Sequence, residues 1–393
     1  MPVFQGVSIF PASNIWNARA DSLPVDPNSD AIIARISEVY QAANGGNTPH
    51  LKVDDMIPWN VVDDSVTFVP LGGISTPESD PGLWPIPNSP LIEAGDGHCL
   101  ILHRTRSMLF EIFFLQGGPG SWTGGSAAKW DLNSEALRPN GWTSSDAAGL
   151  PVLPGIVKYE DILAGSIQHC MRITVSPTMY AQYVWPARHY ASHDTTANNP
   201  QMGMRIRLKA SFDVSGFSPV NQIILRGLQQ YGAMVADNGL PYSMEHDQDS
   251  RWDTNDLLAL HNVPDTAFEF VLTSGLMQDP DLGLAVAIPP ALLMTDQCSR
   301  STPVPYGYHL GLVNGVFQEV GPVQYVNQVC TPEPDRTWLT TKPGGRNFQV
   351  WKNGALLVPN VDYVMGANPP RVIPLPAGTQ WPPTSEVLAA FLY

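Results

Sequence analysis

The segment MGMRIRLKASFDV, residues 202–214, carries the clearest secondary-structure pattern of the chain. Apolar and basic residues alternate along it, which is typical of a β-strand with one face toward a core. Two apolar runs of strand length precede it, HCLILHR (98–104) and LFEIFF (109–114). SIQHCMRITV (166–175) and YAQYVWPARH (180–189) look like further strands. We therefore predict a mainly β fold.

Composition indicates how this fold is organised. The chain has 393 residues, which suits two or three domains. Its 38 prolines and 33 glycines favour short elements joined by long loops. We expect an antiparallel β-sandwich or jelly-roll-like core at residues 1–275, then a Pro-rich connecting segment at 276–330. The Asn-Gly pair in NFQVWKNGALLVP (347–359) predicts a hairpin, and we expect a small C-terminal β-sandwich module at 331–393.

A few peripheral helices should accompany the strands. Apolar residues at helical spacing predict a helix at 27–40, capped by Ser29 or Asp30. Similar patterns predict helices at 219–231 and at 254–261.

Charge and hydropathy narrow the possible partners. The net charge of −15 argues against nucleic acid and against docking on anionic membranes. No apolar stretch approaches the roughly 20 residues that a membrane span needs. The first residues show no basic region followed by an apolar run, so no signal peptide is visible. We expect an extracellular or virion-associated protein that leaves the cell by another route, such as lysis.

The four cysteines show no CxxC or CxxxC spacing, which argues against a structural zinc site. Two arrangements remain open. Cys99 could pair with Cys170 and Cys298 with Cys330, or all four could be buried thiols.

A histidine cluster is the first candidate site. His98 and His169 each precede a cysteine in a predicted strand, and His189 ends another. If these strands are neighbours, His98 and His169 share one face and could bind a divalent metal. Glu111 interrupts the apolar run LFEIFF and would join them. The same groups could act as general acid and base, or could be ordinary surface and core residues.

Carboxylates and aromatic residues suggest a glycan site. Asp131 and Asp146 lie in the irregular, Gly-, Trp- and Pro-rich segment 117–155, and either could pair with Glu111 in glycoside hydrolysis. Asp146 could equally cap a turn, and Asp237 in ADNGLPY reads as a tight turn. Side chains that could stack on sugar rings, or simply pack in the core, are Trp142, Trp185 and Tyr190.

The strand 202–214 supplies candidate ligands for an anion. Arg205, Arg207 and Lys209 share one of its faces, and Arg205 and Arg207 could bind a carboxylate of a substrate. The alternative is a set of salt bridges with Asp213, Asp237 or Glu111.

Two resemblances add to this interpretation. PESDPGLWPIP (77–87), LRPNGWTSSDAAGLPVLPG (137–155) and RIRLKASFDVSGF (205–217) resemble a family of uncharacterised bacterial proteins, many of them secreted. That resemblance covers about two thirds of the chain and implies one recurring domain without an established activity. FQVWKNGALLVPNVDYVM (348–365) resembles the small β modules that end phage tail-fibre and adhesin-like proteins.

The sequence therefore favours a glycan-directed extracellular or particle-surface protein, a polysaccharide hydrolase or lyase. Its partner would be a polysaccharide or surface glycan. The alternative is a non-catalytic structural protein, such as a phage tail, fibre or decoration subunit, that assembles as a homo-oligomer or within a virion. A third reading is a metal-dependent oxidoreductase of the barrel type.

Overall fold

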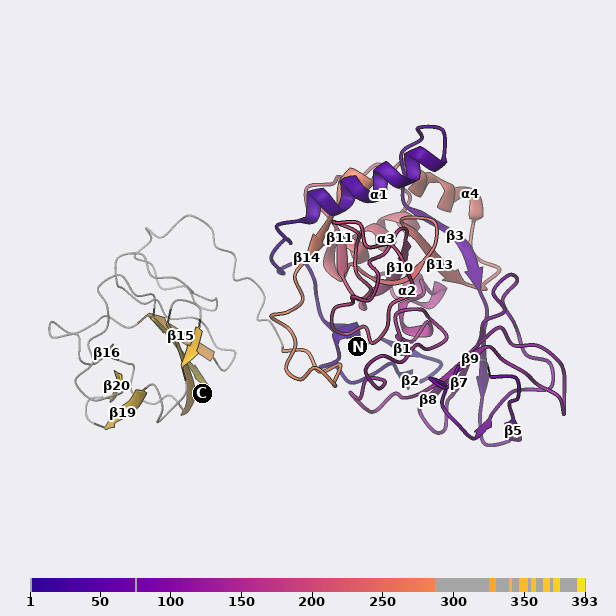
Figure 1. The fold of residues 1–393 in the computed structure, drawn as a ribbon, viewed down its shortest axis with the longest axis horizontal. Helices are drawn as coiled ribbons and strands as arrows, with labels where there is room; N and C mark the ends of the chain where they lie inside the picture. Colours follow the sequence, from indigo (N-terminus) through magenta and orange to yellow (C-terminus); the bar gives the residue numbers. More distant parts are fainter. Residues whose placement is uncertain are drawn as a thin grey trace. The chain divides into compact units, whose positions relative to one another are not determined.

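The computed structural model describes residues 2–74 and 76–286, and beyond them the backbone of strands between Tyr325 and Leu392. The chain forms two compact units, Met1–Ala287 and Ile288–Tyr393. Figure 1 shows the elements of each unit.

A six-stranded mixed sheet is the larger sheet of the first unit. Its strands follow the order β14-β11-β12-β10-β13-β3. The pairs β10–β12 and β13–β3 are parallel, and the other neighbours are antiparallel. The bounds are Phe268–Val271 (β14), Arg205–Leu208 (β11), Ala233–Asn238 (β12), Met171–Val175 (β10), Ser243–Asp247 (β13) and Lys52–Ile57 (β3).

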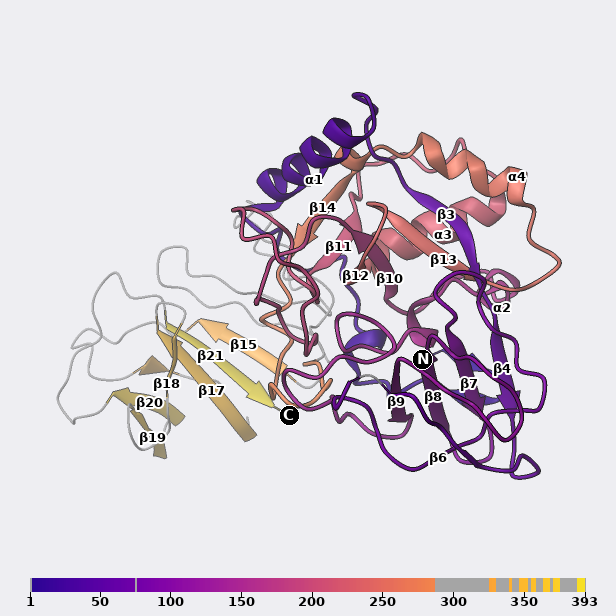
Figure 2. The same cartoon turned by 45° about the vertical axis from the view of Figure 1, so that its right-hand side comes forward.

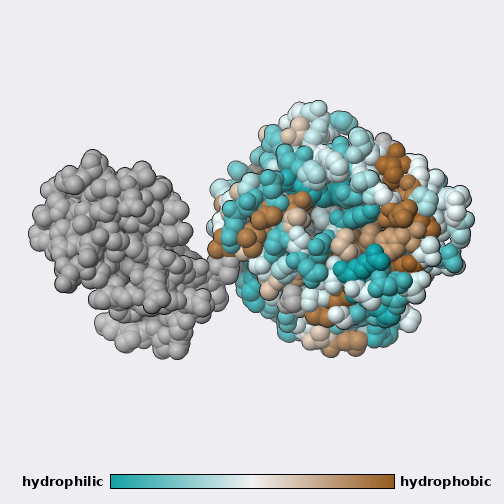
Figure 3. Space-filling view, turned by 90° about the horizontal axis from the view of Figure 1, so that it is seen from below, coloured by the Kyte–Doolittle hydropathy of each residue, from teal (hydrophilic) through white to brown (hydrophobic). Residues whose placement is uncertain are grey.

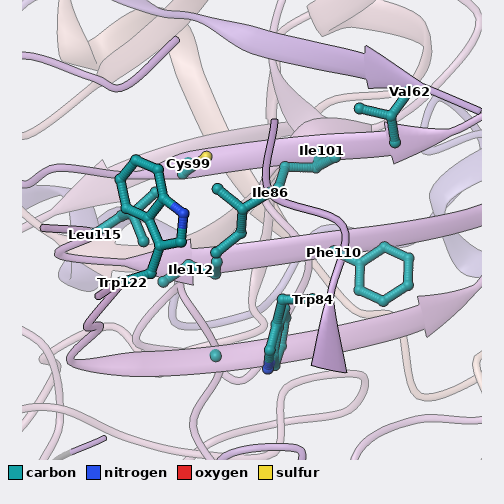
Figure 4. Close-up of a cluster of buried hydrophobic side chains, with 10 residues drawn as sticks. Val62, Trp84, Ile86, Cys99, Ile101, Phe110, Ile112, Leu115 and Trp122 are labelled. Atoms are coloured by element: carbon teal, nitrogen blue, oxygen red, sulfur yellow. The ribbon is translucent and has the colours of Figure 1, made fainter. Parts of the chain in front are cut away.

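A four-stranded sheet lies beneath it, with the order β4-β7-β8-β9 (Figure 2). Its strands are Trp59–Val62 (β4), Cys99–His103 (β7), Met108–Phe113 (β8) and Ser126–Asp131 (β9). Successive side chains of a strand point to opposite faces. Cys99 and Ile101 of β7, with Phe110 and Ile112 of β8, therefore enter one apolar cluster with Trp84 and Trp122 (Figure 4). Glu111 points to the other face of this sheet.

Helices cover parts of the larger sheet. The helix predicted at 27–40 is α1, Ser29–Ala43, which contacts β14. Its cap differs from the prediction, because Asn28 is the N-cap and the Ser29 hydroxyl instead accepts from Phe270 N. The predicted helix at 219–231 is confirmed as α3, Pro219–Gln230, which contacts β11. The helix predicted at 254–261 is α4, Thr254–Leu257, continued by η3, Leu258–Asn262.

Short elements complete the first unit. The helix α2 spans Tyr159–Leu163. The two-stranded pairs are β1–β2 (Val3–Phe4, Val7–Ser8) and β5–β6 (Val69–Pro70, Leu83–Trp84). The remaining 3-10 turns are η1 (Ile15–Asn17), η2 (Leu153–Gly155) and η4 (Asp265–Ala267). No helix among the described residues is long and apolar enough to cross a membrane.

The first unit is thus mixed α/β, with more strand than helix. The prediction of antiparallel pairing is wrong for β10–β12, β13–β3 and β4–β7, which are parallel. Parallel neighbours need a crossover, and the chain between β10 and β12 passes through β11 and α3. A sandwich or jelly-roll arrangement of the sheets stays a prediction.

The segment 180–189 is irregular, although we predicted a strand there. Trp185–Pro186 is a cis peptide, and proline lacks the N–H that a sheet ladder requires. Disulfide pairing of Cys99 with Cys170 is also wrong, because both are buried free thiols. Cys298 and Cys330 lie outside the described residues.

The second unit contains two sheets, β15-β21-β17-β18 and β16-β20-β19. The predicted hairpin is confirmed, because Lys352 of β17 pairs with Ala355 of β18 and leaves two residues for the turn. The strands are Tyr325–Val329 (β15), Leu339–Thr340 (β16), Arg346–Lys352 (β17), Ala355–Leu357 (β18), Tyr363–Ala367 (β19), Pro370–Pro374 (β20) and Val387–Leu392 (β21).

Candidate functional site

A buried loop, residues 144–153, connects the two sheets of the first unit, and we call it the central loop. Glu111 of β8 holds it in place. The Glu111 carboxylate accepts from Val152 N (2.9 and 3.0 Å), Leu153 N (2.8 Å) and Ser145 Oγ (2.9 Å). The residue is completely buried, and burial raises the pKa of its carboxyl. Glu111 therefore has the contacts of a structural acceptor and no solvent access, which gives no geometric support to its predicted role as a catalytic carboxylate.

Replacing Glu111 should mainly affect stability. Alanine at this position leaves two backbone N–H groups and one hydroxyl buried without an acceptor, at about 1–3 kcal/mol each. We expect Glu111→Ala to lower the free energy of unfolding by about 3 kcal/mol or more, as measured by urea denaturation. Glu111→Gln keeps an amide oxygen as acceptor and should lose clearly less. Equal losses for the two variants would contradict this role.

Arg172 connects the central loop to two strands. This β10 residue donates from Nε and one terminal nitrogen to Asp146 of the loop, at 3.0 and 2.9 Å. Its other terminal nitrogen bonds Glu245 of β13. The side chains of Arg172 and Asp146 are 5% and 0% exposed. The guanidinium is thus bound on both sides by carboxylates in a buried, charged network.

Asp237 adjoins this network because of a β-bulge. Ile173 of β10 pairs with Val235 of β12, but Thr174 pairs with Asp237 instead of Ala236. The extra residue turns Asp237 onto the sheet face that carries Thr174 and therefore also Arg172. Bulges often redirect a side chain in this way beside active sites.

The environment of Asp237 favours its protonated form. Burial, and then the negative charge of Asp146, raise the pKa of Asp237 to about 7, although Arg172 and His98 oppose the shift. The side chain is half-buried, and its Oδ1 accepts from Asn238 N at 2.6 Å. Asp237 is therefore a carboxyl group that can exchange a proton near neutral pH.

His98 forms the opposite border of the cluster. Its Nδ1 donates to Glu93 at 2.5 Å and its Nε2 donates to the carbonyl of Ser145 at 2.9 Å. Both partners are acceptors, so both ring nitrogens carry protons. Burial lowers the pKa of His98, but the bond to Glu93 and the charge of that residue outweigh burial and raise it to about 9. His98 is thus an imidazolium, which does not bind metal.

His189 lies beside the central loop. Its Nδ1 is 3.0 Å from the carbonyl of Ala147, and its Nε2 is 3.8 Å from Glu78. A carbonyl only accepts, so Nδ1 carries the proton that makes this bond. The ring stacks on Tyr190 at 5.2 Å, and Tyr190 meets Tyr180 edge to face at 5.3 Å. These rings form a partly exposed aromatic strip.

Backbone hydrogen bonds bring Asp237 and His189 to the same region. Ala148 of the central loop donates to the carbonyl of Ala236, next to Asp237, and accepts from His189 N. Asn238 donates from its side chain to the carbonyl of Ala191. The structure thus brings two predicted site residues, His98 and Asp146, near Asp237, and backbone hydrogen bonds connect His189 to the same central loop.

The contacts of β11 give no geometric support to the predicted anion site. Arg205 is completely buried and donates to the carbonyls of Ile15, Ala18 and Tyr231. Arg207 pairs with Glu269 and donates to two further carbonyls. Through these bonds Arg205 and Arg207 hold residues 15–23 against the six-stranded sheet. The predicted salt bridge does form on this face, but Arg207 pairs with Glu269 instead of Asp213, Asp237 or Glu111, and the Asp213 carboxylate accepts from Ser215.

Asp131 and the two tryptophans each make contacts of their own within the first unit. Asp131 is exposed at the end of β9, where its Oδ1 accepts from Asn133 N. Trp142 is covered by the guanidinium of Arg138, at 5.4 Å from its ring centre. Trp185 donates from Nε1 to the carbonyl of Leu282 at 2.8 Å. Of the predicted stacking residues, Tyr190 stacks on His189, and Trp142 borders the central loop, because a Cβ at Gly149 would lie 2.3 Å from the Trp142 carbonyl oxygen.

The two metal-ligand candidates are separated. β7 and β10 belong to different sheets, so the premise that their strands are neighbours is wrong. His169 Nε2 lies 3.2 Å from Asp161, in a second buried cluster with Lys158, whose pKa burial lowers to about 8. Over residues 2–74 and 76–286, no group of three or more His, Cys, Asp or Glu side chains could hold a metal ion. The metal prediction therefore gains no geometric support.

A separate polar groove of about 530 Å³ lies at the far end of β7 from His98. Val61 and Val62 of β4 and the residues 65–67 line it, and its charged pair is Asp63 with Arg104. That ion pair is satisfied within the protein, so the groove adds no group that could exchange a proton.

No family model, no curated protein and no solved structure matches the chain. Both resemblances noted in the sequence therefore stay predictions. The residues that sequence reasoning missed are Arg172, Glu245 and Glu93. Arg172 in CMRITV, a charged residue within an apolar strand, carried the same signal that drew attention to Glu111.

Proposed function

We propose that the first unit cleaves glycans by acid–base catalysis, with Asp237 as the general acid and His189 as the general base. The observation that carries this proposal is the pKa of about 7 for the half-buried Asp237 carboxyl. An acid with a pKa near the working pH is both protonated and ready to transfer its proton.

His189 has the tautomer that a base requires. Because Nδ1–H donates to the carbonyl of Ala147, the lone pair of the neutral ring lies on Nε2. Glu78, 3.8 Å from that nitrogen, would stabilise the imidazolium that forms after proton uptake. The Ala147 carbonyl and Glu78 thus both orient the His189 ring for proton uptake at Nε2.

In the proposed reaction, protonated Asp237 gives its proton to the bridging oxygen as the bond between that oxygen and the anomeric carbon breaks. A water molecule forms the new bond to the anomeric carbon and loses a proton to His189 Nε2. Return of that proton to Asp237 through solvent restores the starting state. Arg172 positions Asp146 and thereby the charge that keeps Asp237 protonated.

The aromatic strip favours a glycan as the substrate. Tyr180 is 39% exposed and meets Tyr190 edge to face, and Tyr190 in turn stacks on His189. Exposed aromatic faces next to polar groups suit sugar rings, which present apolar C–H faces and hydroxyl edges.

Hydrolysis of a panel of soluble oligosaccharides, followed by reducing-end release and mass spectrometry, tests this proposal. We expect kcat to fall as pH rises through about 7, because Asp237 then loses the proton that it must donate. A rate that rises steadily through pH 7, or no cleavage of any member, would contradict the proposal.

The non-catalytic alternative, a virion or other assembly subunit, stays a prediction. Such a subunit needs broad apolar contact surfaces. On the face of the first unit seen in Figure 3, apolar residues form separate patches interrupted by hydrophilic ones. Light scattering after size exclusion would favour assembly if it showed a large discrete oligomer without glycan cleavage.

A further inference from the structure

We propose that the polar groove beside β4 is a docking site for an extended basic peptide of a partner protein, which adds a strand to the four-stranded sheet. The groove lies at the far end of β7 from His98. The proposal is therefore independent of glycan cleavage at Asp237.

One side of β4 has no strand beside it. Among the described strands, β4 pairs only with β7, in parallel, and forms the edge of its sheet (Figure 2). Alternate residues of such a strand direct both backbone groups to the neighbour. Val62 is one of them, since its carbonyl accepts from Arg104 N at 2.9 Å. The N–H and C=O of Val61 therefore point to the open side, where a further strand can bond them.

The groove includes this open edge. Val61, Val62 and Asp63 line it, and Val61 is 40% exposed. The segments 65–67 and 86–88 also line it, so the groove suits one extended segment better than the edge of a second sheet. A peptide that adds to a sheet edge bonds the strand through its backbone, while alternate side chains enter pockets.

The same edge continues into the larger sheet, but there it is protected. β3 precedes β4, separated from it by Pro58, and η3 packs against β3. His261 of η3 bonds Asp54 of β3 at 2.7 Å. Charges, proline and covering segments are the usual means by which proteins protect an edge strand from pairing. β4, with the sequence WNVV, contains neither a charged residue nor a proline, so this part of the edge is available.

The charge around the groove favours a basic peptide. Arg104 is paired with Asp63, and Glu160 adds a carboxylate that accepts from the neutral amide of Gln5 at 2.6 Å. The whole chain carries a net charge of −15, which attracts a cationic segment and repels a second copy of this chain. We therefore assign the groove to a partner peptide that alternates apolar residues with lysine or arginine.

A labelled nine-residue peptide of alternating valine and lysine tests this proposal by fluorescence anisotropy on the full-length protein. Replacing its lysines with glutamates should weaken binding at least tenfold. Two further peptides carry N-methyl groups on one or the other set of alternate residues. Only one of them should lose affinity, by about tenfold or more, because only one edge of the peptide faces β4. No binding of the parent peptide, or equal affinities of the two N-methylated peptides, would overturn the proposal.

The variant Val61→Pro tests the protein side of the contact. Proline removes the outward N–H and is tolerated on edge strands, so the ladder to β7 should remain. We expect it to weaken binding about tenfold, whereas Val61→Thr keeps the N–H and should bind as the wild type does. Circular dichroism checks the fold of both variants, and the N-methylated peptides decide the question if Val61→Pro does not fold.

Other occupants of the groove give different results. A dimer seen by light scattering and abolished by Val61→Pro would assign the edge to a second copy. Displacement of the peptide by a neutral oligosaccharide would assign the groove to a glycan. Either result, or unchanged peptide affinity in a folded Val61→Pro variant, would overturn the assignment to a partner peptide.

Discussion

The variant Asp237→Asn is expected to lose glycan cleavage and, at the same time, to become more stable than the wild type above pH 7. Asparagine keeps the shape of the side chain and the oxygen that accepts from Asn238 N. The asparagine amide has no acidic proton that it could transfer to the leaving oxygen. Loss of a general acid typically lowers kcat by about a hundredfold to ten-thousandfold.

The gain in stability follows from the raised pKa of Asp237. The pKa of an aspartate in an unfolded chain lies near 3.8, whereas folding raises the pKa of Asp237 to about 7. Between these values the folded state binds more protons, so its stability falls as pH rises toward 7. Asparagine cannot ionise and avoids this loss. We expect a gain of about 2 kcal/mol above pH 7, after allowance for partial solvent exposure, and none below the unfolded pKa.

Urea denaturation at the two pH extremes, together with the cleavage assay, measures both effects. The matched control is Asp213→Asn, which neutralises an exposed carboxylate that accepts from Ser215 outside the site. The control should keep its activity. If Asp237→Asn lost activity and were also less stable than the wild type at high pH, the ionised carboxylate would stabilise the fold. That result would contradict the raised pKa of Asp237.

Patterns of side-chain alternation allowed individual strands to be predicted. β7, β8 and β11 lie where apolar runs or alternation placed them, and the Asn-Gly pair correctly indicated the hairpin of β17 and β18. Alternation reports which residues share a face, but it does not report which strands are neighbours. The proposed metal site failed for this reason, because β7 and β10 belong to different sheets.

The candidate site was predicted in part. The segment 117–155 was predicted to be irregular, although it contains β9, Ser126–Asp131. The central loop within it carries Asp146 and bonds His98 and His189. Asp237 read as part of a tight turn, because ADNG has the composition of one. The residue instead lies within β12, one position before its end, and a one-residue register shift against β10 decides which face it occupies. Such a shift depends on strand pairing and leaves no local signal.

Arg172 is the residue on which most of this arrangement depends for stability. It joins β10, the central loop and β13 through two carboxylates, and Asp146 has no exposed surface through which water could replace the guanidinium. Removing one partner of a buried ion pair leaves the other charge uncompensated, which costs about 3–5 kcal/mol. We expect Arg172→Met to lower the free energy of unfolding by that amount in urea denaturation of the full chain, followed by tryptophan fluorescence.

Two further variants identify the cause of that loss. Asp146→Asn combined with Arg172→Met removes the uncompensated charge, so the double variant should recover part of the stability, and the thermodynamic cycle should give a coupling well above zero. Arg104→Met removes a partner from an exposed pair with Asp63 and should change stability little. If Arg172→Met were as mild as Arg104→Met, the network around Asp237 would not be held by buried charge. The bulge between β10 and β12 would then be the feature that keeps Asp237 in place.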